Sequence, residues 1–142
     1  MIQRIQSVYL LLAAAALVAV LFFGSVWQPA TASFGLFTFT FVAVSVAAGL
    51  VALVAVFLYQ NRPRQRRVVF GAQVLALIQT ALLYGGLYLV GALRYTSPAT
   101  GQVDVGRVVV LLLPVLGYGL LYLARRAITS DIELVRSMDR LR

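Results

Sequence analysis

Residues 7–27 read SVYLLLAAAALVAVLFFGSVW, a stretch in which no side chain carries a charge. A helix needs about 20 apolar residues to cross the roughly 30 Å hydrocarbon core of a bilayer. The stretch is long enough to do so, and Arg4 precedes it. It predicts a first membrane-spanning helix over residues 5–26.

Three more apolar segments follow, at residues 34–59, 68–93 and 108–124, and 62% of the chain is hydrophobic. The last segment is the shortest and contains Pro114, which predicts a kinked helix. Short connections around residues 28–30 and 97–101 favour antiparallel neighbours. We therefore expect an all-α integral membrane protein, a single domain over residues 1–142 that folds as an antiparallel up-down four-helix transmembrane bundle.

The arginines mark one side of this bundle. All 12 basic residues are arginines. Ten precede the first span, fill the connection between the second and third spans, or follow the fourth: Arg4, Arg62, Arg64, Arg66, Arg67, Arg125, Arg126, Arg136, Arg140 and Arg142. Arg94 and Arg107 belong to the other side. Because cytoplasmic loops are enriched in arginine and lysine, we predict a bacterial inner-membrane protein with both termini in the cytoplasm.

A cleaved signal peptide and a nucleic-acid-binding protein fit these features less well. Arg4 and Ala30-Thr31-Ala32 resemble the two ends of a secretory signal peptide, but the apolar part of such a peptide is usually about 7–15 residues long. The net charge of +8 is also typical of nucleic-acid binding. However, the arginines flank apolar spans and form no groove with interleaved aromatic residues. We expect membrane lipids, and not nucleic acid, as partners.

Beyond the fourth span the chain becomes amphipathic, over residues 128–142. Ser130-Asp131-Ile132-Glu133 has the form of a capping box, which is typical of a helix start. Four apolar residues share one helical face: Ile128, Ile132, Val135 and Met138. We expect a short cytoplasmic helix that docks on a partner protein, lies on the lipid head groups or continues the fourth span.

Polar and aromatic residues form a row on the third span: Gln73, Thr80, Tyr84, Tyr88, Gly91 and Tyr95. Their spacing places them within about 80° of one helical face. The fourth span has a similar row of Pro114, Tyr118, Tyr122 and Arg125. Polar side chains in a bilayer seek hydrogen-bond partners, so we expect both rows to face protein. They either pack against each other, line a pocket for a lipid or quinone-like ligand, or contact another subunit.

Pairs of small residues also recur four positions apart in the spans: Ser45 and Gly49, Ala48 and Ala52, Ala81 and Gly85. Such pairs allow two helix backbones to approach closely. We predict that they lie at helix contacts, either inside the bundle or between subunits.

The residues that most often carry catalysis are scarce. The chain has no cysteine and no histidine, and its four acids, Asp104, Asp131, Glu133 and Asp139, lie outside the predicted spans. Proton relays and ion-coupled transport generally use ionisable groups within the spans. We expect no enzymatic activity, no metal site and no cofactor, with at most a bound phospholipid.

The ends of the chain are similar to those of a known family. The segments are MIQRIQSVYLLLA at 1–13, YQNRPRQRRV at 59–68 and ELVRSMDRLR at 133–142. They resemble an uncharacterised family of small four-span membrane proteins, found mainly in Bacteroidetes-type bacteria (domain of unknown function 4293). The resemblance implies an inner-membrane protein without an assigned activity. It singles out Gln3, Arg4, Gln6, Arg136, Ser137, Asp139, Arg140 and Arg142, which we predict to form one cytoplasmic surface joined by a contact between Arg4 and Asp139.

These features favour a non-catalytic accessory or structural subunit of a larger membrane assembly, such as a respiratory or secretion complex, with other integral membrane subunits as partners. A small transporter or channel component is the second hypothesis. It would require a homo-oligomer, because a single four-helix bundle fills its own core. The third hypothesis is a lipid- or quinone-binding module that uses the tyrosine rows.

Overall fold

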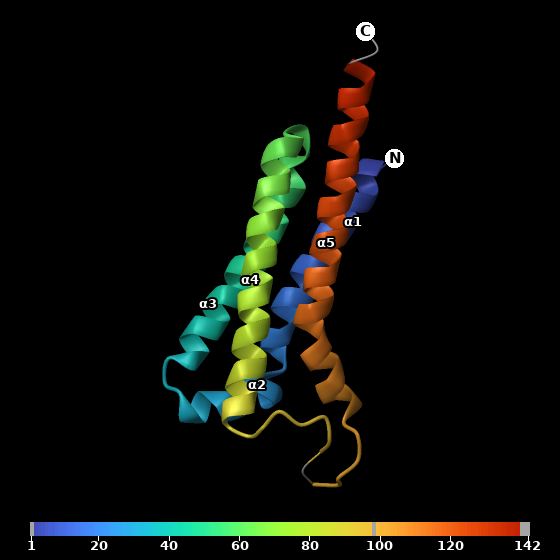
Figure 1. Ribbon diagram of the computed structural model, residues 1–142. Coiled ribbons are helices and arrows are strands. Elements are labelled where there is room, and N and C mark those ends of the chain that lie inside the picture. Colours follow the sequence, from blue (N-terminus) through green and yellow to red (C-terminus); the bar gives the residue numbers. More distant parts are fainter. Residues whose placement is uncertain (1, 98, 140–142) are drawn as a thin grey trace.

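The computed structural model describes residues 2–97 and 99–139, with side chains from Ile5 onward. Its helices are α1 Ile2–Ala19, α2 Gly24–Ser33, α3 Phe37–Phe57, α4 Arg62–Leu89 and α5 Val105–Asp139, with 3-10 turns at Val20–Phe22 and Leu58–Gln60 (Figure 1). Within this described part there is no β-strand, and an isolated antiparallel bridge joins Thr96 and Val103 in the loop before α5. The predicted all-α class is confirmed.

The four predicted apolar spans correspond to four helices that are long and apolar enough to cross a membrane. These run over Ile5–Phe22, Phe37–Gln60, Arg62–Leu89 and Val105–Asp139. In the bundle, α1 contacts α3 and α5, and α4 contacts the same two helices from the other side. The start of α1 and the end of α5 lie at one end of the bundle, called here the terminal end (Figure 1). The opposite end, with α2 and the loop before α5, is called the loop end.

The first span ends earlier than predicted. Residues 24–26 belong to a separate ten-residue helix, α2, and the connection predicted around 28–30 lies inside it. The chain turns at Phe23, and the indole nitrogen of Trp27 donates to the Val20 carbonyl over 3.2 Å. Val26 and Ala30 are buried on the same face of α2. This short helix therefore covers the loop end of the core, where a simple connection was predicted.

The arginine-rich connection is also shorter than predicted, because α4 begins at Arg62 and includes all four arginines in its first turns. Asn61 caps the helix, since its side-chain oxygen accepts from the backbone nitrogen of Arg64 over 3.3 Å. Pro63 occupies the first turn, where its missing N–H costs nothing. Asn-x-Pro was therefore the local signal for the start of this helix.

The tail helix predicted over residues 128–142 continues the fourth span, one of the three alternatives, because α5 runs without a break from Val105 to Asp139. Ser130 and Glu133 lie in its interior, so they form no capping box at a helix start. The cause is local: residues 120–139 contain no glycine or proline that would end the helix. Pro114 also remains inside α5, whose orange stretch changes direction in Figure 1.

Small residues let α1 pack closely between α3 and α5. A side chain at Gly49 of α3 would overlap Val18 of α1, and one at Gly117 of α5 would approach Leu17 to 2.7 Å. Because lipid tails are as apolar as leucine, close packing and not transfer from water holds such helices together. The predicted pairs of Ser45 with Gly49 and of Ala48 with Ala52 are buried at these contacts.

The third predicted pair, Ala81 and Gly85, lies elsewhere. Ala81 is exposed, and a side chain at Gly85 would meet nothing within 4 Å. This pair therefore lies at no contact inside the bundle, and its place at a contact between subunits stays a prediction. The buried face of α4 at this level is formed by Leu83, Gly86 and Leu87, which pack against α2 and α3.

We predict that Gly49→Ala lowers the free energy of unfolding by about 1–3 kcal/mol, because the new methyl group overlaps the stiff, branched side chain of Val18. Gly85→Ala is the matched control, since its methyl group meets open space. The thermal unfolding midpoint of the purified protein in mild detergent reports both effects. Equal losses for the two variants would contradict the close contact between α1 and α3.

Candidate functional site

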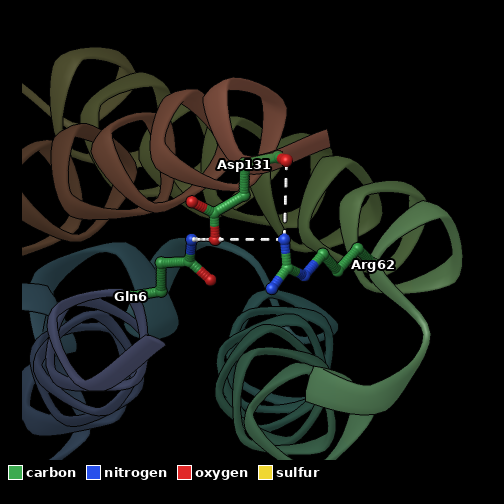
Figure 2. A network of polar contacts seen from close by, with 3 residues as sticks. All are labelled: Gln6, Arg62 and Asp131. Carbon is green, nitrogen blue, oxygen red and sulfur yellow. Dashed lines mark hydrogen bonds and ion pairs between the residues drawn. The ribbon is translucent and has the colours of Figure 1, made fainter. Parts of the chain in front are cut away.

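A polar network joins three helices near the terminal end (Figure 2). Gln6 of α1 donates from Nε2 to the Oδ2 atom of Asp131 on α5, over 2.6 Å. The Nη1 atom of Arg62, at the start of α4, lies 3.8 Å from the same carboxylate oxygen and 3.4 Å from the Asp131 backbone carbonyl. One acidic residue therefore connects α1, α4 and α5.

Burial makes these contacts necessary. Gln6 and Asp131 are only 4% and 5% exposed, and a carboxylate removed from water is costly unless it is paired and hydrogen-bonded. Arg62 remains partly exposed, so it reaches the carboxylate from the edge of the bundle. The network is an internal clamp, because its acid is closed off from solvent.

Two buried glutamines of α4 make further contacts with neighbouring helices. Gln65 donates to the Ala55 carbonyl of α3 over 2.9 Å, and Gln79 donates to the Leu17 carbonyl of α1 over 2.8 Å. Leu17 lies just before the α-helix changes into the 3-10 turn at Val20, where the regular ladder of carbonyl bonds changes as well. These amide contacts fix the rotation of α4, because a buried amide needs a partner.

Arg125 of α5 is positioned by α4. Its Nη1 atom donates to the Gln73 side-chain oxygen over 3.2 Å, and its guanidinium carbon lies 4.7 Å from the centre of the Phe70 ring. Gln73 is buried, whereas Arg125 is partly exposed. An arginine has five N–H donors, so these contacts leave donors of Arg125 available at the boundary between α4 and α5.

An open groove of about 440 Å³ lies at this boundary and is called here the arginine groove. Its lining has the arginines Arg66, Arg125 and Arg126, the hydroxyls of Tyr122, Thr129 and Ser130, and the carboxylate of Glu133. A second groove of about 280 Å³ shares Arg66 and adds Arg67 and Arg136. In the part of the chain with described side chains, no carboxylate lies within ion-pair distance of these five arginines.

The predicted polar row on α4 divides into two parts. Gln73 faces α5, and the Tyr84 hydroxyl donates to the Leu111 carbonyl of α5 over 2.9 Å. Thr80 donates to a carbonyl of its own helix, that of Ala76. Gln73 and Tyr84 therefore contact α5, whereas the described bond of Thr80 stays within α4.

Tyr88 and Tyr95 are exposed instead. They therefore do not pack within the chain, for two reasons, and their contact with a ligand or another subunit stays a prediction. At the loop end Leu83, Gly86 and Leu87 form the inward face of α4, and Tyr95 lies beyond the helix end at Leu89.

In the row on α5, Pro114 is buried, Tyr118 packs against the core and Tyr122 is exposed at the arginine groove.

The residues predicted on the cytoplasmic side, which include the arginines between the second and third spans, have different roles. Arg62 belongs to the clamp, and Arg66, Arg67 and Arg136 line the two grooves. Arg64 and Asp139 are exposed. The side chain of Arg4, and Arg140 altogether, lie outside the described residues, and the predicted contact of Arg4 with Asp139 lies there too. Gln6, predicted on the cytoplasmic surface, is instead buried, and it makes a polar contact with Asp131 of α5.

Sequence reasoning missed the roles of Asp131, Gln65 and Gln79. Asp131 had a signal, because it lies three residues after Ile128 and four before Val135 and therefore shares their apolar face. Gln79 had one too, as an amide inside an apolar span. The burial of Gln65 had no signal, because it lies in a run of arginines.

A protein-family model described as a domain of unknown function (DUF4293) matches residues 2–141. The chain belongs to this family. No curated protein and no solved structure matches it. Membership in the DUF4293 family agrees with the resemblance of the two ends and the arginine-rich segment, and it assigns no activity.

We predict that Asp131→Ala lowers the free energy of unfolding by about 1–3 kcal/mol, because it leaves the buried Gln6 amide without its acceptor. Asp131→Asn retains an oxygen that accepts from Gln6, so it should cost less. Asp139→Ala, an exposed acid on the same helix, is the control and should change stability by less than about 0.5 kcal/mol. Thermal midpoints in detergent would measure all three, and an Asp131→Ala loss no greater than the control would refute the clamp.

Proposed function

We propose that this protein is a non-catalytic integral protein of the inner membrane and an accessory subunit of a larger membrane complex, such as a respiratory or secretion assembly. Its four apolar helices would cross the bilayer as an antiparallel up-down bundle with the terminal end in the cytoplasm. Family membership and the four apolar helices support the membrane location. The charges and the uncovered end of α5 support the orientation and the role as a subunit.

The arginines support the orientation because they gather at the terminal end. α4 starts there with four arginines in its first turns, and Arg136 lies near the end of α5. Arg94, in the loop before α5, and Arg107, in the first turn of α5, belong to the loop end. Under the positive-inside rule the terminal end faces the cytoplasm.

The orientation can be tested with single cysteines, since the natural chain has none. We expect Thr100→Cys, in the loop before α5, to react with a membrane-impermeant maleimide on intact spheroplasts. Ser137→Cys, near the end of α5, should react only after permeabilisation. Both positions are exposed, and the cysteine-free protein is the control. The reverse pattern would overturn the proposed orientation.

The observation that carries the subunit role is an apolar face that continues past the bundle. Along one face of α5 the exposed fraction rises from 0% at Ile128 to 45% at Val135 and 64% at Met138. Figure 1 shows the cause: α5 extends beyond α1 and α4 at the terminal end. This stretch, residues 133–139, is called here the overhang. Its apolar face continues the face that packs against the bundle, so it points over the other helices and not toward surrounding lipid.

A partner subunit that covers this face would bury apolar side chains that otherwise remain in water. Burying a valine or methionine side chain contributes about 1.5–3 kcal/mol. The overhang also has a polar side with Glu133, Arg136 and Ser137, as is usual at the rim of a protein interface.

We predict that Val135→Gln with Met138→Gln weakens association with the partner at least about tenfold. Ser137→Gln is the matched control, because it changes the opposite side of the overhang. The measurement is mild solubilisation from the native membrane, followed by quantitative mass spectrometry of the proteins that co-migrate with each variant. Stoichiometric partners that the wild type and Ser137→Gln retain, and the double variant loses, would support the proposal.

Recovery of the wild type alone, or only with copies of itself, would overturn the role as an accessory subunit. The homo-oligomeric transporter would then be the next hypothesis, tested by solute flux into liposomes that contain the purified protein. Loss of the partner from Ser137→Gln as well would show that the overhang contacts it through another face.

A further inference from the structure

We propose that the arginine groove binds the phosphate group of an anionic phospholipid, with the acyl chains lying along α4 and α5 below it. The inference rests on the membrane location, but it is independent of the proposed role as a subunit. The groove lies where two apolar helices reach the arginine-rich terminal end, so its ligand would come from the cytoplasmic leaflet.

Unpaired positive charge is the first support. Arg66, Arg125 and Arg126 converge on the groove from two helices. Glu133 is the acid in its lining, and it forms no ion pair with these arginines within the described residues. Arginine binds phosphate through parallel N–H donors and keeps its charge at any physiological pH. The groove therefore has surplus charge for one phosphate diester.

Preorganisation is the second support. Gln73 and the Phe70 ring hold the guanidinium of Arg125 from α4, although Arg125 belongs to α5. A donor that is already positioned loses little entropy when an anion binds. The hydroxyls of Tyr122 and Ser130 in the same lining supply neutral donors for the remaining phosphate and glycerol oxygens.

The surface below the groove is the third support. On α4, Phe70 and Leu77 lie four and eleven positions after Arg66, so they share its helical face, and both are exposed. On α5, Val115 and Tyr122 are similarly placed with respect to Arg126, and both are exposed. The charged groove therefore continues into two apolar faces that would contact acyl chains, which a soluble phosphate compound does not have.

The test uses the purified full-length protein in detergent and measures lipid binding by native mass spectrometry. The probes are phosphatidylglycerol, phosphatidylcholine with the same acyl chains, and inorganic phosphate as a competitor. We expect wild-type protein to retain phosphatidylglycerol in preference to phosphatidylcholine. Arg66→Gln with Arg126→Gln should weaken phosphatidylglycerol binding about thirtyfold. The matched control is Arg64→Gln with Arg107→Gln, which removes two exposed or half-exposed arginines that do not line the groove.

Equal weakening in the two double variants would overturn the proposal, because binding would then follow total charge and not this groove. Displacement of the lipid by millimolar inorganic phosphate would also overturn it, in favour of a soluble phosphate ligand. If the first double variant unfolds, Tyr122→Phe and Arg126→Gln, each at the groove surface, provide single variants with the same readout. Wild-type affinity in both of these would refute the site.

Discussion

The carboxylate of Asp131 has to be paired inside the protein, because it is almost completely removed from water. Its partners come from the first turns of α1 and α4, which are far from it in the sequence. The three helices can satisfy it together only at one axial position and one rotation of each. Below this point, Gly49 and Gly117 let α1 fit between α3 and α5, so the clamp and the close packing act on the same helix.

Neutral amides make the polar contacts deeper in the bundle. A glutamine can donate and accept without the large desolvation cost of an ion, so Gln65 and Gln79 link α4 to α3 and α1 at moderate cost. Gln79 is not fully satisfied, because its Oε1 atom has no partner within the described residues. Its donor bond to the Leu17 carbonyl lies close to the point where α1 changes from α-helix to a 3-10 turn.

The terminal end combines two surfaces of different chemistry. The arginine groove lies between α4 and α5, and its arginines form no ion pair within the described residues. The overhang of α5 carries an apolar face over the top of the bundle, beyond the ends of α1 and α4. We propose a lipid head group for the first surface and a protein partner for the second, and Glu133 belongs to both surfaces.

The sequence by itself determined the number of apolar helices, the helical class and the separation of arginines into two groups, because length, hydropathy and charge are read along the chain without knowledge of packing. Helix ends were predicted less accurately. Local signals were missed for the start of α4 at Asn61 and for the continuation of α5 through residues 120–139. The helix α2 had no such signal, because it forms where Val26 and Ala30 are buried against other helices. Only the tertiary structure decided that Gln6 meets Asp131, that Gln73 holds Arg125, and that Tyr88 is exposed. Each of these depends on the rotation of one helix against another, and that rotation is set by many side chains from several helices at once.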